Sequence, residues 1–126
     1  MGKQTINTLN APAPIGPYSQ AVKAGGLLYI SGQIAINPIT SELITGSITQ
    51  EAEQVMNNLK AILESVGLGF SNVIKTTIFL SDMELFANVN EVYGKFFDTD
   101  YPARETIAVK GLPKNVNVEI SMIASE

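Results

Sequence analysis

The stretch SITQEAEQVMNNLKAILESVGLGFSNVIKTTIFL, residues 47–80, decides the fold class because its hydrophobic period changes along its length. Apolar side chains first recur every three or four residues, which predicts an amphipathic helix of about five turns over residues 48–66. Gly67 then predicts the end of the helix. The closing VIKTTIFL is rich in β-branched and aromatic residues, so we predict a strand over residues 73–80.

The segments on either side continue this mixture of helix and strand. Gly25 and Gly26 suit a tight turn between two strands, and the residues near the C-terminus place apolar side chains at every second position. The predicted elements, in chain order, are strands over residues 18–23 and 27–36, a helix over residues 48–66 capped by Ser47 or Thr49, a strand over residues 73–80, a helix from Ser81 or Asp82 to about residue 97, and strands over residues 105–110 and 116–124.

The order ββαβαββ predicts an α+β fold in which two helices pack on one face of a mixed sheet. The helices cover one face only, so the other face is left for a different contact, and we expect a second subunit there. No internal repeat, low-complexity tract or linker interrupts the chain, and its 126 residues predict a single domain over residues 1–126.

The composition excludes several classes of chemistry and of partner. The chain has no cysteine and no histidine, which removes thiolate metal sites, a Cys nucleophile and the commonest general base. The formal net charge is −4 and the eight Lys and Arg residues are scattered singly, so we expect no nucleic-acid partner. No apolar run approaches the roughly 20 residues of a membrane span, and the N-terminus lacks a signal-peptide apolar region. We therefore expect no membrane contact and a cytoplasmic location.

Three polar residues stand at positions where the local pattern does not require them. Arg104 follows a Pro-Ala pair, and its planar guanidinium suits a carboxylate ligand; the alternative is a salt bridge with Asp98 or Asp100. Glu119 lies in mid-strand, either as a proton-transfer group in a chain without histidine or on a solvated strand face. Asn90 falls within the apolar stripe of the second helix, either as a site residue or as an amide bonded to neighbouring backbone.

Two positions in the first pair of strands are weaker candidates. Tyr18 is a strand tyrosine of the kind that usually packs against its neighbours. Ser31 is followed by Gly32, and such a pair often marks a β-bulge or a close approach of two backbones. Each of these residues has a structural explanation that is sufficient by itself.

Seven short motifs follow one another along the chain. They are IGPYSQAV (residues 15–22), ISGQIAINP (30–38), NNLKAILESVG (57–67), VIKTTIFLSDM (73–83), VNEVYGKFF (89–97), YPAR (101–104) and LPKNVNVEI (112–120). In this order and spacing they resemble the Rid family of imine deaminases, also called YjgF-like proteins, over about residues 11–124. The specificity lies in the series, since no single motif is decisive.

The resemblance implies a chorismate-mutase-like, or YjgF-like, α+β subunit and a homotrimer whose sheets face one another in a central barrel, with three clefts between subunits. It implies a RidA-type hydrolase that converts 2-imino acids such as 2-iminobutanoate and 2-iminopropanoate, and their enamine tautomers, to 2-oxo acids and ammonia. It implies neither a cofactor nor a metal. The substrates are reactive metabolites released by pyridoxal-phosphate enzymes such as serine/threonine dehydratases, so the role is detoxification.

The resemblance also implies a set of site residues, carried over one position at a time. Arg104 binds the substrate carboxylate, Glu119 positions or activates the attacking water, and Tyr18 steers the imine nitrogen or closes the pocket. The remaining cleft residues are Ser31, Gly32, Asn90 and Thr106, the last at a position that is Cys in some members.

Glu105 departs from the family pattern, because a small residue often follows the arginine. On an alternating strand its side chain points away from Arg104, so we expect it to bond elsewhere. Two other functions stay open. The first is a non-catalytic trimer that binds 2-oxo acids as a regulator, which would use Arg104 in the same way. The second is an RNA-cleaving translation inhibitor, which the acidic charge and the absence of histidine oppose.

Overall fold

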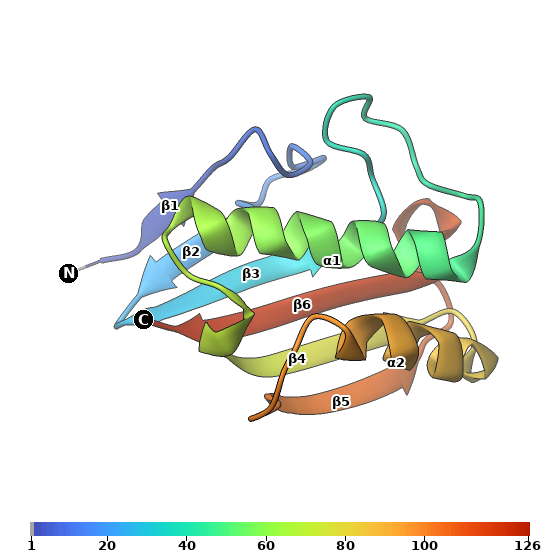
Figure 1. Cartoon of the computed structure of the whole chain (residues 1–126). Helices are drawn as coiled ribbons and strands as arrows, with labels where there is room; N and C mark the ends of the chain where they lie inside the picture. The colour runs from blue at the N-terminus through green and yellow to red at the C-terminus, as the bar shows by residue number, and fades with distance from the viewer. Residues whose placement is uncertain (1) are drawn as a thin grey trace.

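Alternating burial along the strands creates one apolar sheet face, and both helices cover it. A computed structural model describes residues 2–126. The chain forms a six-stranded sheet of order β1-β2-β3-β6-β4-β5, with α1 and α2 side by side on one face (Figure 1). The elements are β1 (Gln4–Ile6), β2 (Ala21–Ala24), β3 (Leu27–Gln33), α1 (Ile48–Ser65), η1 (Phe70–Asn72), β4 (Val73–Leu80), η2 (Met83–Leu85), α2 (Phe86–Gly94), β5 (Ala103–Ala108), η3 (Pro113–Asn115) and β6 (Val118–Ser125).

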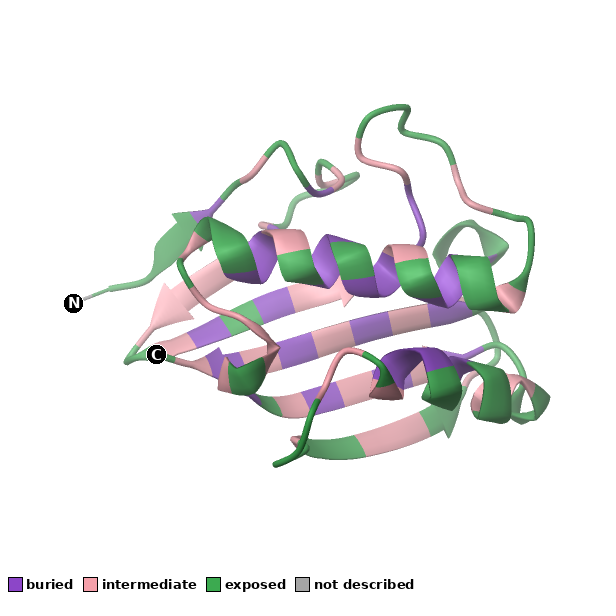
Figure 2. Cartoon of the chain, in the orientation of Figure 1, coloured by how far each residue is buried: buried purple, intermediate pink, exposed green. Residues whose placement is uncertain are grey.

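The predicted α+β class and the placement of both helices on one face are confirmed. Strands β4 and β5 are parallel and are joined through α2, whereas every other neighbouring pair is antiparallel, so the sheet is mixed. A parallel pair needs a crossover connection, and α2 supplies it. Figure 2 shows buried residues recurring along α1 and alternating along β6, and the core is made of buried residues from the helices and the sheet.

Helix α1 forms the largest part of the core. Its side chains at Val55, Met56, Leu59, Ile62 and Leu63 are fully buried, as the helical spacing predicts. The structure also decides between the two predicted N-caps. The Ser47 hydroxyl accepts a hydrogen bond from the Gln50 N–H at 3.2 Å, so Ser47 caps the helix.

The predicted second helix is wrong at both ends. Asp82 caps the short 3₁₀ turn η2 rather than α2, and its carboxylate accepts from the Glu84 N–H at 2.8 Å. Helix α2 ends at Gly94, a poor helix former, which is followed by backbone bonds of the tighter i→i+3 type. Phe97 therefore lies beyond the helix, where its ring packs edge-to-face on Phe70 with the centroids 5.3 Å apart.

Several strand boundaries also differ from the prediction. Strand β5 spans Ala103–Ala108 rather than residues 105–110, and strand β6 begins at Val118 rather than residue 116. Strand β1 was not predicted, because three residues carry little periodicity; it pairs with β2 at the edge of the sheet. Strand β2 begins at Ala21 rather than residue 18, which leaves Tyr18 in a loop. Strand β3 ends at Gln33 rather than residue 36, and its pairing with β6 shifts between Ile30 and Gln33. The shift places a bulge at Ser31–Gly32, as the Ser-Gly pair indicated.

The sheet face opposite the helices is partly exposed. Tyr29 and Ile107 lie on it with 44% and 43% of their surface exposed, among polar side chains. This face is the one for which the sequence predicts a second subunit. Across residues 2–126, no helix has the length and apolar character needed to cross a membrane.

Candidate active site

The predicted site residues gather in two cavities. Tyr18, Ser31, Gly32 and Glu119 line a cavity of 370 Å³ together with Pro12, Ala13, Ile15, Gln20, Gln33, Ile34, Ile36 and Pro113. Arg104 and Asn90 line another, of 470 Å³, together with Tyr93, Gly94, Tyr101 and Pro102. We call these the Glu119 cavity and the Arg104 cavity. Thr106 lines neither.

The strand register explains this separation. Glu119 on β6 lies opposite Phe79 of β4, on the face away from the helices, while its neighbour Ile120 is buried under them. Arg104 on β5 lies opposite Thr76 of β4, which is buried on the helix face. Since paired residues share a face, Arg104 and Glu119 project to opposite sides of the sheet. One chain by itself does not bring them together.

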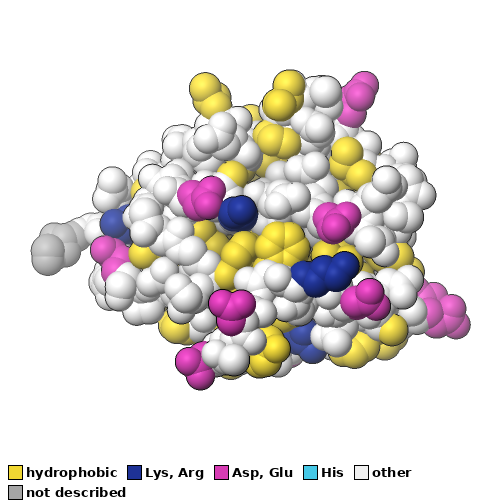
Figure 3. All heavy atoms as spheres, in the orientation of Figure 1, with side chains coloured by type: hydrophobic (Ala, Val, Ile, Leu, Met, Phe, Trp, Pro, Cys, Tyr) yellow, Lys and Arg dark blue, Asp and Glu magenta, His cyan; other side chains and the backbone are white. Residues whose placement is uncertain are grey.

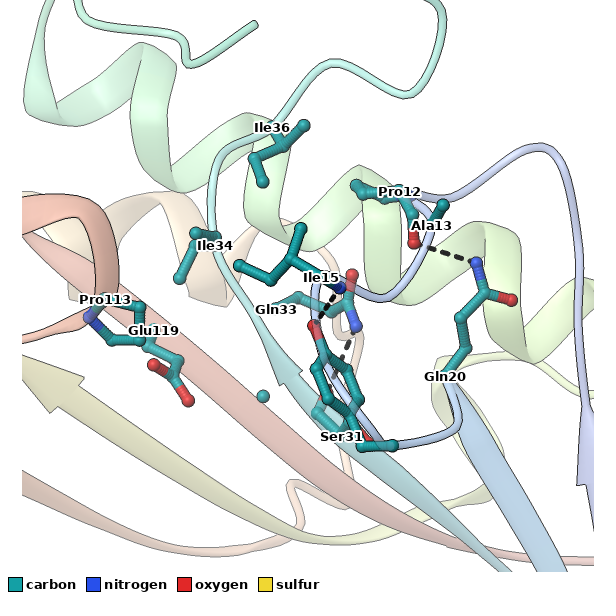
Figure 4. Close-up of a pocket in the computed structure, with 12 residues that line it drawn as sticks. Pro12, Ala13, Ile15, Gln20, Ser31, Gln33, Ile34, Ile36, Pro113 and Glu119 are labelled. Carbon is teal, nitrogen blue, oxygen red and sulfur yellow. Dashed lines mark hydrogen bonds between the residues drawn. The ribbon is translucent and has the colours of Figure 1, made fainter. Parts of the chain in front are cut away.

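The Glu119 carboxyl lies within its cavity beside Pro113, across from Ile15 and Ser31 (Figure 4). It is half-buried, and among residues 2–126 no hydrogen bond to its oxygens is found. Burial raises the pKa of the Glu119 carboxyl above its ordinary value, because the charged form loses contact with water. The carboxyl is thus an acid–base group with no fixed partner among the described residues.

The bulge in β3 brings the backbone beneath this carboxyl. The Ser31 hydroxyl donates to the Ser19 carbonyl at 2.6 Å, and the Ser31 N–H donates to the Gln20 carbonyl at 3.0 Å. Ser31 therefore ties β3 to the loop before β2. Its hydroxyl proton is already engaged, which leaves the oxygen lone pairs for a ligand.

Tyr18 reaches the cavity from that same loop. Its phenol oxygen accepts from the Ile15 N–H at 3.3 Å, and its ring packs beside Gly16. About half of the residue, 47%, is exposed. The loop folds over its own tyrosine, which fixes the phenol at the rim of the cavity.

Two buried amides hold the cavity walls, and sequence reasoning did not single them out. The Gln20 Nε2 donates to the carbonyls of Thr8, Ala11 and Pro12 at 3.0, 3.2 and 2.9 Å. The Asn58 Nδ2 on α1 donates to the carbonyls of Ile34 and Ile36 at 3.1 and 3.0 Å.

These residues had a signal in the sequence. Gln20 sits within a family motif, and Asn58 is an amide on the buried side of a helix. An amide at a buried position needs partners, and here the partners are loop carbonyls.

In the Arg104 cavity, the guanidinium is held by α2. Its Nη1 donates to the Asn90 Oδ1 at 2.8 Å, and its central carbon lies 5.0 Å from the Tyr93 ring centre and 5.6 Å from that of Phe86. The Tyr93 hydroxyl donates to the Thr76 hydroxyl at 3.0 Å. Burial raises the pKa of the Tyr93 phenol, while the Thr76 bond and the Arg104 charge act in the opposite direction.

Both local alternatives for these residues are wrong. Within residues 2–126 the side-chain ion pairs are Lys23–Glu126 and Lys75–Glu105, so Arg104 is not paired with a nearby aspartate. Asn90 is exposed and bonds the guanidinium rather than neighbouring backbone. A guanidinium carries five N–H donors, so a side chain that uses one of them for Asn90 keeps several for a ligand.

Glu105 bonds elsewhere, as predicted. Its carboxylate accepts from the Thr77 hydroxyl and pairs with the Lys75 ammonium at 3.2 Å, on the sheet face away from Arg104. The Thr77 hydrogen bond, with the Lys75 contact, lowers the pKa of the Glu105 carboxyl. Thr106 shares the face of Arg104, but its hydroxyl is buried and has no partner among residues 2–126.

Comparisons with known proteins show the family to which the chain belongs. The family model described as endoribonuclease L-PSP matches residues 8–126. A 2-iminobutanoate/2-iminopropanoate deaminase of Dermatophagoides farinae is 47% identical and covers 96% of this chain and 94% of its own. RidA from an Antarctic Psychrobacter superposes with a TM-score of 0.94 at 46% identity, covering 98% of this chain and 99% of that one.

A third relative carries a ligand. E. coli TdcF with bound serine superposes with a TM-score of 0.93 at 40% identity, and 98% of each chain is covered. The likeness extends over nearly the whole length in every one of these proteins. The chain therefore belongs to the endoribonuclease L-PSP family, which is the YjgF/Rid family that its motifs resemble.

Proposed function

We propose that this protein hydrolyses reactive 2-imino acids, including 2-iminobutanoate and 2-iminopropanoate and their enamine tautomers, to 2-oxo acids and ammonia. The observation that carries the proposal is that the Arg104 guanidinium is held in place without a carboxylate partner among the described residues. Its guanidinium is fixed by Asn90 and two aromatic rings and has no carboxylate partner among residues 2–126. Such a group is prepared for an anionic ligand of the size of a carboxylate.

The proposed reaction needs an anchor, an attacking water and a route for protons. Arg104 would bind the substrate carboxylate through two parallel N–H bonds and so fix the imine carbon in place. Glu119 would accept a proton from a water as its oxygen bonds to that carbon. Glu119 would return this proton to the imine nitrogen, which gives a carbinolamine. It would then accept the proton of the carbinolamine hydroxyl and pass it to the amino nitrogen as the C–N bond breaks, so that ammonia leaves and the carbonyl of the 2-oxo acid forms. Burial supports this role, because a raised pKa makes the carboxylate a better proton acceptor.

The proposed site forms between copies of the chain. Arg104 and Glu119 face opposite sides of the sheet, so a complete site requires the Arg104 cavity of one copy to meet the Glu119 cavity of another. The partly apolar open face of the sheet supports assembly into a homotrimer around that face. Tyr18, Ser31 and Gly32 would then line the Glu119 side of the substrate and Asn90 the Arg104 side, whereas Thr106, with its hydroxyl buried, would lie outside the contact.

The direct test replaces Arg104 with lysine and measures 2-oxo acid and ammonia formed from imines that a dehydratase releases in the same vessel. We expect Arg104→Lys to lose most of the turnover at unchanged thermal stability, because a point charge does not reproduce the two-point contact. Glu105→Gln is the matched control, since its side chain points the other way. Turnover by Arg104→Lys at the wild-type rate would remove the anchoring role.

A non-catalytic regulator that binds 2-oxo acids is the main competing function. It would use Arg104 identically but would not need Glu119 as a base. Ammonia release by the wild type, abolished in Glu119→Gln while 2-oxo acid binding persists, supports the enzyme. Binding with no ammonia release above the uncatalysed rate supports the regulator.

The family model carries the word endoribonuclease, so RNA cleavage is the second competitor. The net charge of −4 opposes it, and on the face shown in Figure 3 the Lys and Arg side chains lie singly among carboxylates. We expect purified protein to leave labelled RNA intact. Cleavage that survives in Arg104→Ala would point to an RNA site outside the Arg104 cavity.

A further inference from the structure

We propose that Gly32 is a positioning residue, which holds the Glu119 carboxyl in the cavity by leaving free the space that any other side chain would fill. The inference deepens the proposed function and rests on it in one respect, namely that Glu119 is the group that activates water. It concerns the two residues that the bulge of β3 and the start of β6 bring together.

The contact between the two residues is closer than any side chain at position 32 would permit. A β-carbon built on Gly32 would lie 2.8 Å from the Cδ of Glu119 and 3.0 Å from its Cγ, with the Oε2 nearer still. Real β-carbons essentially never approach another heavy atom this closely. The Glu119 side chain therefore lies across the backbone of Gly32, against a surface that only glycine provides.

The backbone itself does not require glycine at this position. Gly25, Gly26 and Gly67 have positive φ angles, whereas Gly32 does not. An alanine at position 32 is thus compatible with the local chain path, and its methyl group would meet only the far end of a flexible side chain. The methyl displaces the carboxyl rather than the strand, so the variant should keep the fold.

The displaced carboxyl has no other group to hold it. No hydrogen bond to its oxygens is found within residues 2–126, and the only other titratable group among the residues lining the cavity is the Tyr18 phenol. On the neighbouring strand, Phe79 lies opposite Glu119, and Lys75 lies opposite Ile123 and pairs with Glu105. Displacement therefore moves the carboxyl from a half-buried position toward water.

The experiment measures the position of Glu119 through its titration, independently of activity. The protein is labelled with ¹³C at glutamate side-chain carboxyls, and the Glu119 signal is assigned by its loss in Glu119→Gln. We expect Gly32→Ala to lower the pKa of Glu119 toward the ordinary glutamate range and to reduce kcat by about tenfold or more, a change of about 1.4 kcal/mol in the barrier. Gly111→Ala is the control, because a β-carbon there meets nothing within 4 Å and its φ is not positive.

The outcomes test two claims separately: that Gly32 positions the Glu119 carboxyl, and that this carboxyl takes part in the reaction. A lowered pKa with reduced turnover supports both. A lowered pKa with unchanged turnover supports the positioning by Gly32 and overturns the catalytic role of Glu119. An unchanged pKa overturns the positioning, whatever happens to turnover.

A double variant tests the proposal if Gly32→Ala alone does not fold. If Gly32→Ala does not fold while Gly32→Ala combined with Glu119→Ala does, the collision is with the carboxylate side chain and the proposal is supported. If neither folds, position 32 needs glycine for its backbone and the proposal is overturned.

Discussion

Glu119 on β6 and Glu105 on β5 show how the surroundings of a strand residue change the pKa of its carboxyl group. Glu119 is half-buried and no donor to it is found between residues 2 and 126, whereas Glu105 has a hydroxyl and an ammonium group beside it. Their pKa values move in opposite directions for these reasons. A group that a protein keeps in an unfavourable environment is often there for function rather than for stability.

Glu119→Gln should stabilise the fold at neutral pH. Burial raises the pKa of Glu119 in the folded protein. The contribution of this residue to the free energy of unfolding is therefore present below the ordinary glutamate pKa and is lost as the pH rises through the raised value. Gln carries no charge, so its advantage appears at pH 7 and disappears near about pH 4. The unfolding temperatures of the wild type and Glu119→Gln are measured across this range. A difference that does not change with pH would contradict a raised pKa for Glu119.

Glu105→Gln should behave in the opposite way. Its lowered pKa means that its contribution to stability is present above the ordinary value and is lost as the pH falls through the lowered one. The variant is therefore expected to be the less stable protein at neutral pH, with the difference closing in acid. The same unfolding series tests it, and equal stability at neutral pH would show that the Lys75 and Thr77 contacts contribute nothing.

Two substitutions at Tyr93 distinguish the effect of its ring, which packs against Arg104, from the effect of its hydroxyl, which bonds Thr76. Tyr93→Phe keeps the ring under the guanidinium but leaves the buried Thr76 hydroxyl without its partner, which should cost about 1 kcal/mol of stability with KM unchanged. Tyr93→Leu removes the ring and should raise KM more than it lowers kcat. Equal KM values for the two variants would show that the ring does not position the arginine.

Much of this residue-level picture was open to prediction. The alternation of β5 sets Arg104 and Glu105 on opposite faces without any coordinates. The partner of Arg104 was not predictable from spacing, because Asn90 reaches it only after α2 folds back over β5. The approach of Gly32 to Glu119 depends on a bulge and on the pairing of two strands from opposite ends of the chain.

At the scale of elements, the first turn of α1 fixes the start of β6. Glu51 is buried, and its carboxylate accepts from the Asn117 N–H at 2.8 Å, the Asn117 Nδ2 at 2.9 Å and the Val118 N–H at 3.3 Å. Glu119 follows directly. A carboxylate with several donors can hold a strand end against a helix, since it has acceptor capacity for each of them.

Glu51→Gln should loosen this junction. The amide offers one acceptor oxygen in place of two and turns an NH₂ group toward N–H donors, so about 1–3 kcal/mol of unfolding free energy should be lost. Glu53→Gln, exposed on the same turn, is the matched control. Denaturant unfolding measures both, and equal midpoints would mean that Glu51 is dispensable.

The prediction of the elements succeeded where periodicity is long and failed where it is short. Helix α1 and strand β4 were predictable because many consecutive positions repeat one pattern. Strand β1 has three residues, and the chain beyond α2 packs on a distant segment through the Phe70–Phe97 ring contact. Tertiary contacts of this kind decide boundaries after local preference has set the centre of an element.

At the scale of the whole molecule, the two cavities lie on opposite faces of one sheet. The proposed site then needs two chains, and this can be tested by mixing variants that we expect to be inactive. Arg104→Ala and Glu119→Gln, refolded together in equal amounts, should recover roughly one quarter of the wild-type sites through random pairing in a closed ring. Each variant refolded alone is the control. A mixture no more active than its components would place the whole site within one chain.

The two halves of the site also differ in how far apart their residues lie along the chain. Arg104 and Asn90 are 14 residues apart and belong to a single crossover unit, whereas Gly32 and Glu119 come from opposite ends of the sequence. Contacts between near neighbours close small loops and form early, and distant ones form late. The proposed anion-binding half can therefore assemble while the chain is still incomplete, but the half with the proposed base exists only after the last strand has entered the sheet.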